Sequence, residues 1–146
     1  SVKPTVLFFE GIEGIKKVWQ DHLKQKGEIL EFIGIEEIHP ELQKYIKEHY
    51  IWKRAEKKVP LKMLISGPTV AGIFKVKSDS YELREVRNID GSLFPIPLGC
   101  DIYGESVSIT LHRKDSEPVG LIIRSKEIAT TMRSLFNFIW EKAKIS

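Results

Sequence analysis

The chain has 146 residues, 42% of them hydrophobic, and its 23 basic and 20 acidic side chains give a net charge of +3. We expect a single domain over residues 1–146, because a chain of this length buries roughly 70% of its unfolded surface and needs no metal or disulfide to hold a core. The lone Cys100 excludes an internal disulfide and a multi-cysteine zinc site, and the balanced composition excludes a disordered tail.

The first part of the chain alternates predicted strands and helices. Val6–Phe9 is a short strand-forming run, followed by a glycine-containing turn. Apolar residues at intervals of three and four predict an amphipathic helix over Ile12–Lys26, with Gly27 as its C-terminal cap. Glu28–Ile35 is largely apolar on both faces, which is typical of a central strand covered on both sides.

A second helix is predicted to begin at His39-Pro40 and to end near Lys58, before Pro60. Its expected buried stripe consists of Leu42, Tyr45, Ile46, His49 and Trp52. Leu61–Ile65 follows as the third strand. Residues 69–82 show only a poor helical period, so a third helix there stays open.

The second half contains several predicted strands in succession and a closing helix. Leu83–Ile89 is a strand, and Asp90-Gly91 is a hairpin-type turn. The next strands are Leu98–Tyr103, Ser106–His112 and Val119–Ile123, the first two joined at Gly104-Glu105. Ser125 caps a final helix whose predicted stripe is Ile128, Met132, Leu135, Phe136, Ile139 and Trp140. This order predicts an α/β fold with a mixed β-sheet flanked by helices.

The charge pattern argues against nucleic-acid binding by a broad surface. The positive excess is confined to residues 40–62, which carry 7 basic and 3 acidic side chains, whereas a nucleic-acid-binding domain usually has a broader basic face or a known motif. No apolar run reaches the roughly 18 residues of a membrane span, and the N-terminal residues lack the apolar core of a signal peptide. We expect a cytoplasmic protein without membrane contact.

Common catalytic motifs are absent from the sequence. It has no Gly-x-Ser-x-Gly elbow, no phosphate-binding loop and no dinucleotide-binding glycine motif. Glu36, Glu37 and His39 gather potential metal ligands after a strand, but helix capping explains them better, and we expect no metal or cofactor. Cys100 is interpreted as a buried structural thiol, since no base or charge beside it is evident.

Three further histidines are interpreted as structural or surface residues. His22 and His49 lie on the inward stripes of their helices and are interpreted as packing residues. His112 ends a strand beside Arg113 and is interpreted as a surface residue.

Two stretches resemble known families. Gly120–Phe136 together with Trp140 resembles the end of a phospholipase D-like domain, in which a strand leads into a helix with Leu-Phe and a Trp. Val6–Lys17 together with Leu83–Ile89 resembles the C-terminal region of TrmB-type prokaryotic transcriptional regulators. These pieces span nearly the whole chain and imply a phospholipase D-like fold.

The catalytic motif of the phospholipase D-like enzymes is missing. That motif is His-x-Lys-x-x-x-x-Asp-Gly, and aligning its Gly with Gly104 places Ile96, Leu98 and Tyr103 at the His, Lys and Asp positions. The His of such enzymes attacks phosphorus and the Lys binds the phosphoryl oxygens, so their loss removes covalent attack and charge stabilisation together. The resemblance implies the fold without the hydrolase, and a divergent phosphodiesterase or nuclease is the enzymatic alternative.

In TrmB-type regulators a winged helix-turn-helix reads DNA, and the C-terminal region senses an effector or dimerises. We therefore hypothesise a non-catalytic ligand-sensing and dimerisation domain of a transcriptional regulator, expected to be part of a longer chain and to reach DNA only through a separate helix-turn-helix domain. A purely structural dimerisation module is a further alternative. For an effector such as a sugar, the candidate residues at strand ends are Glu10, Glu36, Ser66 and Cys100.

We expect a homodimer, because phospholipase D-like domains commonly pair and regulators of palindromic sites need a two-fold partner. Phe138 lies off the main stripe of the final helix. Either it contacts a second copy or the helix presents a wide face to the core.

Overall fold

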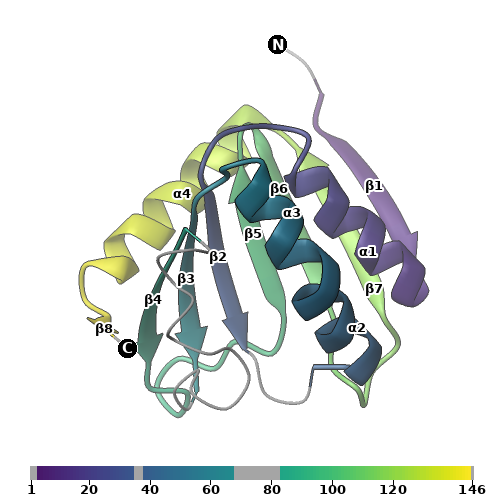
Figure 1. Cartoon of the computed structure of the whole chain (residues 1–146). Helices are drawn as coiled ribbons and strands as arrows, with labels where there is room; N and C mark the ends of the chain where they lie inside the picture. Colours follow the sequence, from purple (N-terminus) through teal and green to yellow (C-terminus); the bar gives the residue numbers. More distant parts are fainter. Residues whose placement is uncertain (1–2, 35–37, 68–82, 146) are drawn as a thin grey trace.

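The computed structural model, which describes residues 3–34, 38–67 and 83–145, contains one eight-stranded sheet (Figure 1). The strands are β1 (Thr5–Glu10), β2 (Ile29–Gly34), β3 (Leu61–Ser66), β4 (Arg84–Ile89), β5 (Gly99–Tyr103), β6 (Ser106–Leu111), β7 (Val119–Arg124) and β8 (Lys144–Ile145). Their order in the sheet is β1-β7-β6-β5-β2-β3-β4-β8. β2, β3 and β4 are parallel, and every other neighbouring pair is antiparallel. The predicted mixed sheet is confirmed.

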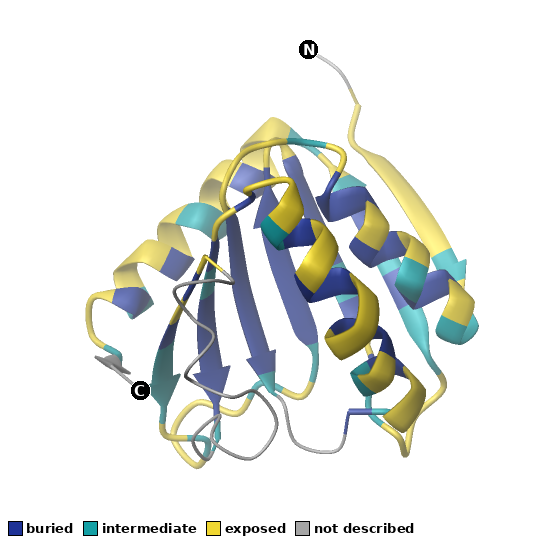
Figure 2. Ribbon diagram, in the orientation of Figure 1, coloured by how far each residue is buried: buried dark blue, intermediate teal, exposed yellow. Residues whose placement is uncertain are grey.

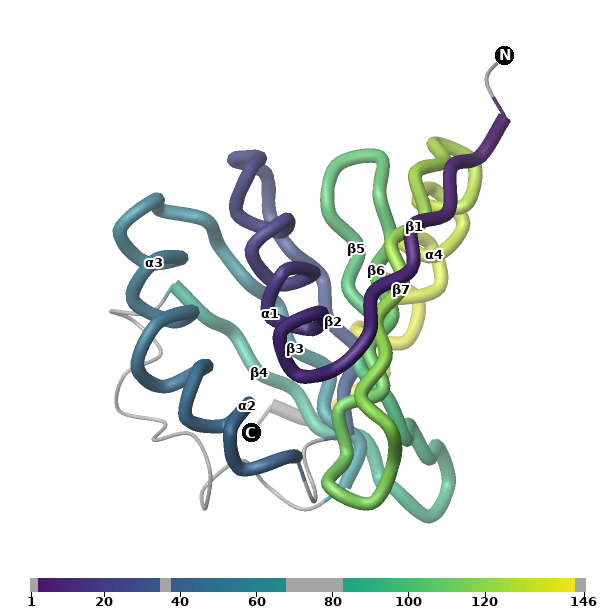
Figure 3. Tube along the Cα trace, turned by 90° about the vertical axis from the view of Figure 1, so that its right-hand side faces the viewer, coloured from purple at the N-terminus to yellow at the C-terminus, as the bar shows by residue number. Residues whose placement is uncertain are grey.

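Helices cover both faces of this sheet, as Figures 1 and 3 show. One face carries α1 (Gly11–His22), α2 (Pro40–Tyr45), the π-helical turn η1 (Ile46–Tyr50) and α3 (Ile51–Glu56). The other face carries α4 (Lys126–Trp140), which begins at Ser125, whose hydroxyl accepts a hydrogen bond from the amide of Ile128 as predicted. The sheet therefore separates two hydrophobic cores.

β2 contributes residues to both cores, which is why both of its faces carry apolar side chains. Ile29 and Ile33 pack beneath α1 and α2, whereas Leu30 and Phe32 pack beneath α4. Phe32 meets the ring of Phe136 at a centroid distance of 5.0 Å. The central strands are buried while β1 is mostly exposed, as Figure 2 shows. The prediction of a central strand is confirmed.

The first helix ends earlier than the sequence predicts. α1 stops at His22 rather than near Lys26, and Gly27 does not cap it. Side chains donate to carbonyl groups that would accept backbone amides if the helix continued. Gln25 donates to the carbonyl of His22 at 3.0 Å, and Lys57 donates to that of Leu23 at 2.9 Å. Tertiary contacts thus end the helix where periodicity alone extended it.

The second predicted helix contains a π-helical turn that changes which side chains are buried. A π-turn holds one extra residue, so the buried stripe shifts by one position beyond it. Tyr50 and Ile51 become buried, whereas the predicted stripe residues His49 and Trp52 are exposed. The prediction for these two residues was wrong because it assumed a uniform α-helical period.

Three other predictions have definite outcomes. The hairpin at Gly104 is confirmed, because β5 pairs with β6 across it. Asp90-Gly91 does not form a hairpin, since β4 pairs with β3 and β8 and not with β5. Phe138 is 65% exposed, so the wide core-facing helix was the wrong alternative for this side chain. The open assignment of residues 69–82 lies outside the described residues.

Candidate functional site

A cleft of about 610 Å³ opens at the edge of the sheet where the parallel strands β2, β3 and β4 end. In open α/β sheets the carboxyl ends of parallel strands are where ligand sites form, because strands diverge there and loops supply side chains. The residues that line the cleft are Gly34, Ser66, Gly67, Asp90, Gly91, Ser92, Pro95, Ile96, Pro97 and Arg113.

Close backbone packing gives this cleft its shape. A Cβ atom on Gly34 would lie 2.1 Å from the carbonyl oxygen of Ile96, so only glycine allows the 95–98 segment to press against the end of β2. The amide of Gly34 donates to the carbonyl of Leu98 at 3.3 Å. Ser66 anchors the same loop from β3 by donating its hydroxyl to the carbonyl of Phe94 at 2.5 Å.

The charged groups at the cleft have neighbouring partners. The carboxylate of Asp90 accepts hydrogen bonds from the amide of Ser92 at 2.9 Å and from its hydroxyl at 2.7 Å. Arg113 donates from Nε to the carboxylate of Asp115 at 3.2 Å. Among the described residues, the cleft presents one anionic and one cationic side chain together with hydroxyl groups, glycine backbone and the apolar Ile96.

The three positions aligned with the hydrolase motif are placed at different depths. Ile96, which the sequence resemblance aligns with the His of the hydrolase motif, lines the cleft. Leu98 packs against the core beneath α4. Tyr103 lies at the far end of β5 and donates its hydroxyl to Asp21 at 2.8 Å. Of the three aligned positions, the one that lines the cleft is thus apolar.

His112 corrects the prediction of a surface residue, because it is fully buried behind the cleft. Its Nε2 lies 3.1 Å from the carbonyl oxygen of Gly34, and its Nδ1 lies 3.4 Å from the hydroxyl of Thr110. Burial lowers the pKa of its imidazole. His112 and Lys114 have His-x-Lys spacing, but after β6 and not before the hairpin, and neither imidazole nitrogen is open toward the cleft.

Of the four sequence candidates for a ligand site, the three that the structure describes are not brought together. Ser66 lines the cleft, and Glu36 lies outside the described residues. Cys100 packs beneath α4, where burial raises the pKa of its thiol to about 11, as expected of a structural thiol. Glu10 ends the edge strand β1 and does not line the cleft.

Sequence reasoning missed three polar residues at the cleft: Asp90, Ser92 and Arg113. Asp90 and Ser92 could have been identified because they follow β4 directly, and β4 runs parallel to β3. This signal was overlooked because Asp90-Gly91 has the composition of a hairpin turn. Arg113 follows an antiparallel strand, and no local sequence pattern identifies it.

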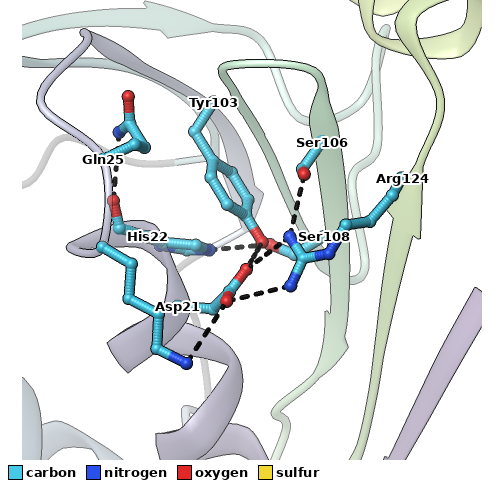
Figure 4. A network of polar contacts seen from close by, with 8 residues as sticks. Asp21, His22, Gln25, Tyr103, Ser106, Ser108 and Arg124 are labelled. Atoms are coloured by element: carbon cyan, nitrogen blue, oxygen red, sulfur yellow. Dashed lines mark hydrogen bonds and ion pairs between the residues drawn. The ribbon is translucent and has the colours of Figure 1, made fainter.

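A buried polar network joins α1 to the sheet (Figure 4). Arg124 donates two hydrogen bonds to the carboxylate of Asp21, at 3.0 and 3.1 Å, and a third to the hydroxyl of Ser106 at 3.0 Å. Burial alone would raise the pKa of Asp21, but the hydrogen bonds from Arg124 and Tyr103 outweigh it and keep this pKa below its ordinary value.

His22 extends the network inward and is fully buried, which confirms its predicted packing role. Its ring nitrogens lie 2.9 Å from the hydroxyl of Tyr50 and 2.7 Å from that of Ser108. Burial lowers the pKa of His22 to about 3, so the ring is neutral at physiological pH.

Asp101 lies next to this network, with its carboxylate 3.9 Å from Nε2 of His22. Burial and the neighbouring carboxylate of Glu31 on β2 raise the pKa of Asp101 well above its ordinary value. His22 and Asp101 are sealed from solvent, whereas Arg124 at the other end of the network is exposed. The network ties α1 to the sheet.

No cluster of three metal-ligating side chains occurs within the described parts of the chain. His39 instead caps α2, its Nδ1 accepting the amide of Glu41 at 3.2 Å, which confirms the capping interpretation of this residue. Glu36 and Glu37, the other two members of that sequence cluster, are not described. None of the helices described is both long and apolar enough to cross a membrane.

Comparisons with known proteins identify the fold. No protein-family model matches the chain, and no curated protein matches it. Among solved structures, NucT from Helicobacter pylori is 11% identical with a TM-score of 0.72, over 99% of this chain and 100% of that chain. Nuc from Salmonella typhimurium, a phospholipase D family member, is 12% identical with a TM-score of 0.69, over 99% of each chain.

The archaeal chromatin protein TrmBL2 is also similar, at 20% identity and a TM-score of 0.67 over 97% of this chain. The present chain spans about half of that protein, 54% of its length. Both resemblances seen in the sequence therefore hold at the level of the fold. The chain has the phospholipase D-like fold.

Proposed function

We propose that this chain is a non-catalytic ligand-sensing and dimerisation domain of a transcriptional regulator. The observation that carries the proposal is the apolar Ile96 in the cleft, at the position where hydrolases of this fold carry their nucleophile. A phosphodiester there would meet no imidazole to attack it and no ammonium at position 98 to neutralise it. The similarity to TrmBL2, whose structure is described as showing a mode of DNA binding, supports a regulatory setting.

The cleft chemistry favours a neutral ligand rich in hydroxyl groups, such as a sugar. Asp90 and Arg113 present opposite charges that neighbours already balance, so a strongly charged ligand gains little net attraction. Ser66, Ser92 and the glycine backbone supply short-range hydrogen-bonding groups, and Ile96 and the two prolines supply an apolar wall. Such a mixture of a few placed polar groups on an apolar surface is typical of small-molecule sites.

Calorimetric titration with a panel of mono- and disaccharides tests the ligand claim. We expect saturable binding by at least one member, weakened at least about tenfold in Asp90→Ala, which loses a cleft carboxylate. Glu10→Gln is the matched control, because that carboxylate lies outside the cleft. Binding by no member of the panel would favour the structural dimerisation module, and equal losses in both variants would place the ligand elsewhere.

The proposed dimerisation draws on apolar side chains that the single chain leaves uncovered. Two separate surfaces are candidates for the interface: on α4, Leu135 is 49% exposed and Phe138 is 65% exposed, and on β1 Phe8 is 59% exposed. Exposed apolar groups gathered on one molecule commonly mark an interface between proteins. Sedimentation equilibrium at micromolar concentration should give the mass of a dimer, and a monomer mass across the concentration range would refute dimerisation.

DNA contact by this domain alone should be weak. Lys44, Lys47 and Lys53 are exposed on the α2–α3 segment, but Glu41 and Glu48 alternate with them. A mixed surface releases few counterions from DNA. Titration with random duplex DNA should therefore give micromolar or weaker, strongly salt-dependent binding. Nanomolar sequence-specific binding at physiological salt would contradict the proposal that a separate domain reads DNA.

A further inference from the structure

β1 forms an open edge of the sheet, with β7 as its sheet neighbour within the described residues (Figure 1). The amide of Gly11 donates to the carbonyl of Pro118 at 2.8 Å, directly beyond the last strand pair. In an antiparallel pair, alternate residues direct their backbone groups to the same neighbour. Odd-numbered residues of β1 therefore bond to β7, and the N–H and C=O groups of Val6, Phe8 and Glu10 point to the open edge.

The side chains of this edge strand are apolar and lack the features that usually block edges. Val6 is 60% exposed, Leu7 37% and Phe8 59%, and no charged residue occurs between Lys3 and Glu10. Natural proteins usually protect a free edge with an inward-pointing charge, a proline or a bulge inside the strand, because unpaired backbone groups template further strand pairing. β1 is a regular six-residue strand without any of these.

We propose that β1 pairs antiparallel with β1 of a second copy, about a two-fold axis at Leu7. This inference rests on the proposed dimerisation and assigns its interface. The register places Val6 of each copy opposite Phe8 of the other, so their outward N–H and C=O groups exchange hydrogen bonds. Glu10 falls opposite Pro4. Because proline has no N–H, this pair forms one backbone hydrogen bond instead of two at each end of the interface.

The strand favours a second copy as its occupant because its two ends have opposite charge. Lys3 precedes one end and Glu10 closes the other, and antiparallel pairing brings the Lys3 end of each copy to the Glu10 end of its partner. Val6 and Phe8 also lie on the same sheet face, opposite Ile123 and Leu121 of β7. Pairing therefore joins the Val6 and Phe8 side chains of both copies into one apolar cluster, which increases their burial.

Disulfide cross-linking reads this register directly. Leu7 lies on the proposed axis in a non-hydrogen-bonded pair, where Cα atoms are roughly 4.5 Å apart, within the range that a disulfide spans. In a Cys100→Ser background, Leu7→Cys should give a covalent dimer in mild oxidant. Thr5→Cys is the matched control, because Thr5 falls opposite Phe9 and the two copies of Thr5 are roughly 14 Å apart. Equal cross-linking of both variants, or of neither, overturns the register.

A second pair of variants separates this interface from the α4 surface. Val6→Pro removes an outward N–H and leaves the β7 ladder intact, so two hydrogen bonds are lost per dimer and dimerisation should weaken at least about tenfold. Leu135→Glu changes the other candidate surface, on α4, and should leave dimerisation unchanged. Sedimentation equilibrium gives the result, with circular dichroism to establish folding. Loss of the dimer in Leu135→Glu alone overturns the β1 interface but not dimerisation, whereas a monomeric wild-type chain overturns both.

Discussion

Replacement of His22 by Gln should remove a specific component of the acid sensitivity of the fold. The ring is fully buried, and burial lowers its folded-state pKa to about 3 from the ordinary 6.5. Above pH 6.5 the ring is neutral in both the folded and the unfolded chain, so it gives no pH dependence. Below pH 6.5 the unfolded chain takes up a proton that the folded chain does not, and the free energy of unfolding falls as the pH falls.

The size of this effect follows from the two pKa values. Each pH unit between 6.5 and the folded-state pKa costs about 1.4 kcal/mol, so the loss reaches about 3 kcal/mol at pH 4.5 and about 4 kcal/mol near pH 3. His22→Gln keeps a side chain that can hydrogen-bond to Tyr50 or Ser108 but has no such titration. Whatever the stability of the variant at pH 7.5, its stability relative to wild type should rise on acidification.

Urea unfolding at pH 7.5, 6.5, 5.5 and 4.5, followed by tryptophan fluorescence and circular dichroism, measures this difference. The free energy of unfolding of wild type minus that of His22→Gln should be constant from pH 7.5 to 6.5 and then decrease by about 1.4 kcal/mol per pH unit. Taking the difference cancels titrations common to both proteins. A difference that stays constant down to pH 4.5 would refute the assignment of a buried neutral imidazole.

Three other substitutions or probes test the interior and the cleft. Asp101→Asn should stabilise the fold at pH 7, because the pKa of Asp101 is raised on folding and its ionised form is therefore disfavoured in the folded chain; the gain should shrink as the pH falls toward 4, and urea unfolding that shows no pH-dependent gain would contradict it. Cys100 should react with a thiol reagent at least about a hundredfold more slowly than in the urea-unfolded chain, since the thiol is buried and its pKa is about 11; equal rates would contradict its place in the core. Gly34→Ala should destabilise the fold by about 2 kcal/mol or more, because the new Cβ would meet the carbonyl of Ile96, and an unchanged urea midpoint would contradict the close packing at the cleft.

The sequence predicted the architecture well where local patterns and packing agree. β2 is apolar on both faces because two helical layers cover it, and the Gly104 hairpin and the Ser125 cap rest on local turn and capping chemistry. The resemblance to phospholipase D-like domains added the fold family, which hydrophobic periodicity does not determine.

Predictions failed where tertiary structure altered a local rule. The π-turn over Ile46–Tyr50 moved His49 to the surface, and no periodicity analysis that assumes a uniform helix identifies such a turn. His112 appeared to be a surface residue because Arg113 and Lys114 follow it, yet it lies behind the end of β2. Of the cleft residues, only Ser66 was selected, because the cleft depends on which strands are parallel neighbours.

The measurement that tests the central claim most directly is phosphodiester hydrolysis by the purified chain. Bis-p-nitrophenyl phosphate and single- and double-stranded DNA should show no turnover above buffer, because under the proposed alignment the apolar Ile96 stands in the cleft at the nucleophile's position and both nitrogens of His112 are engaged. His39→Ala and His112→Ala should leave that baseline unchanged. Turnover that persists through purification to homogeneity and disappears in either variant would contradict the account, because it would show that the chain retains a catalytic histidine.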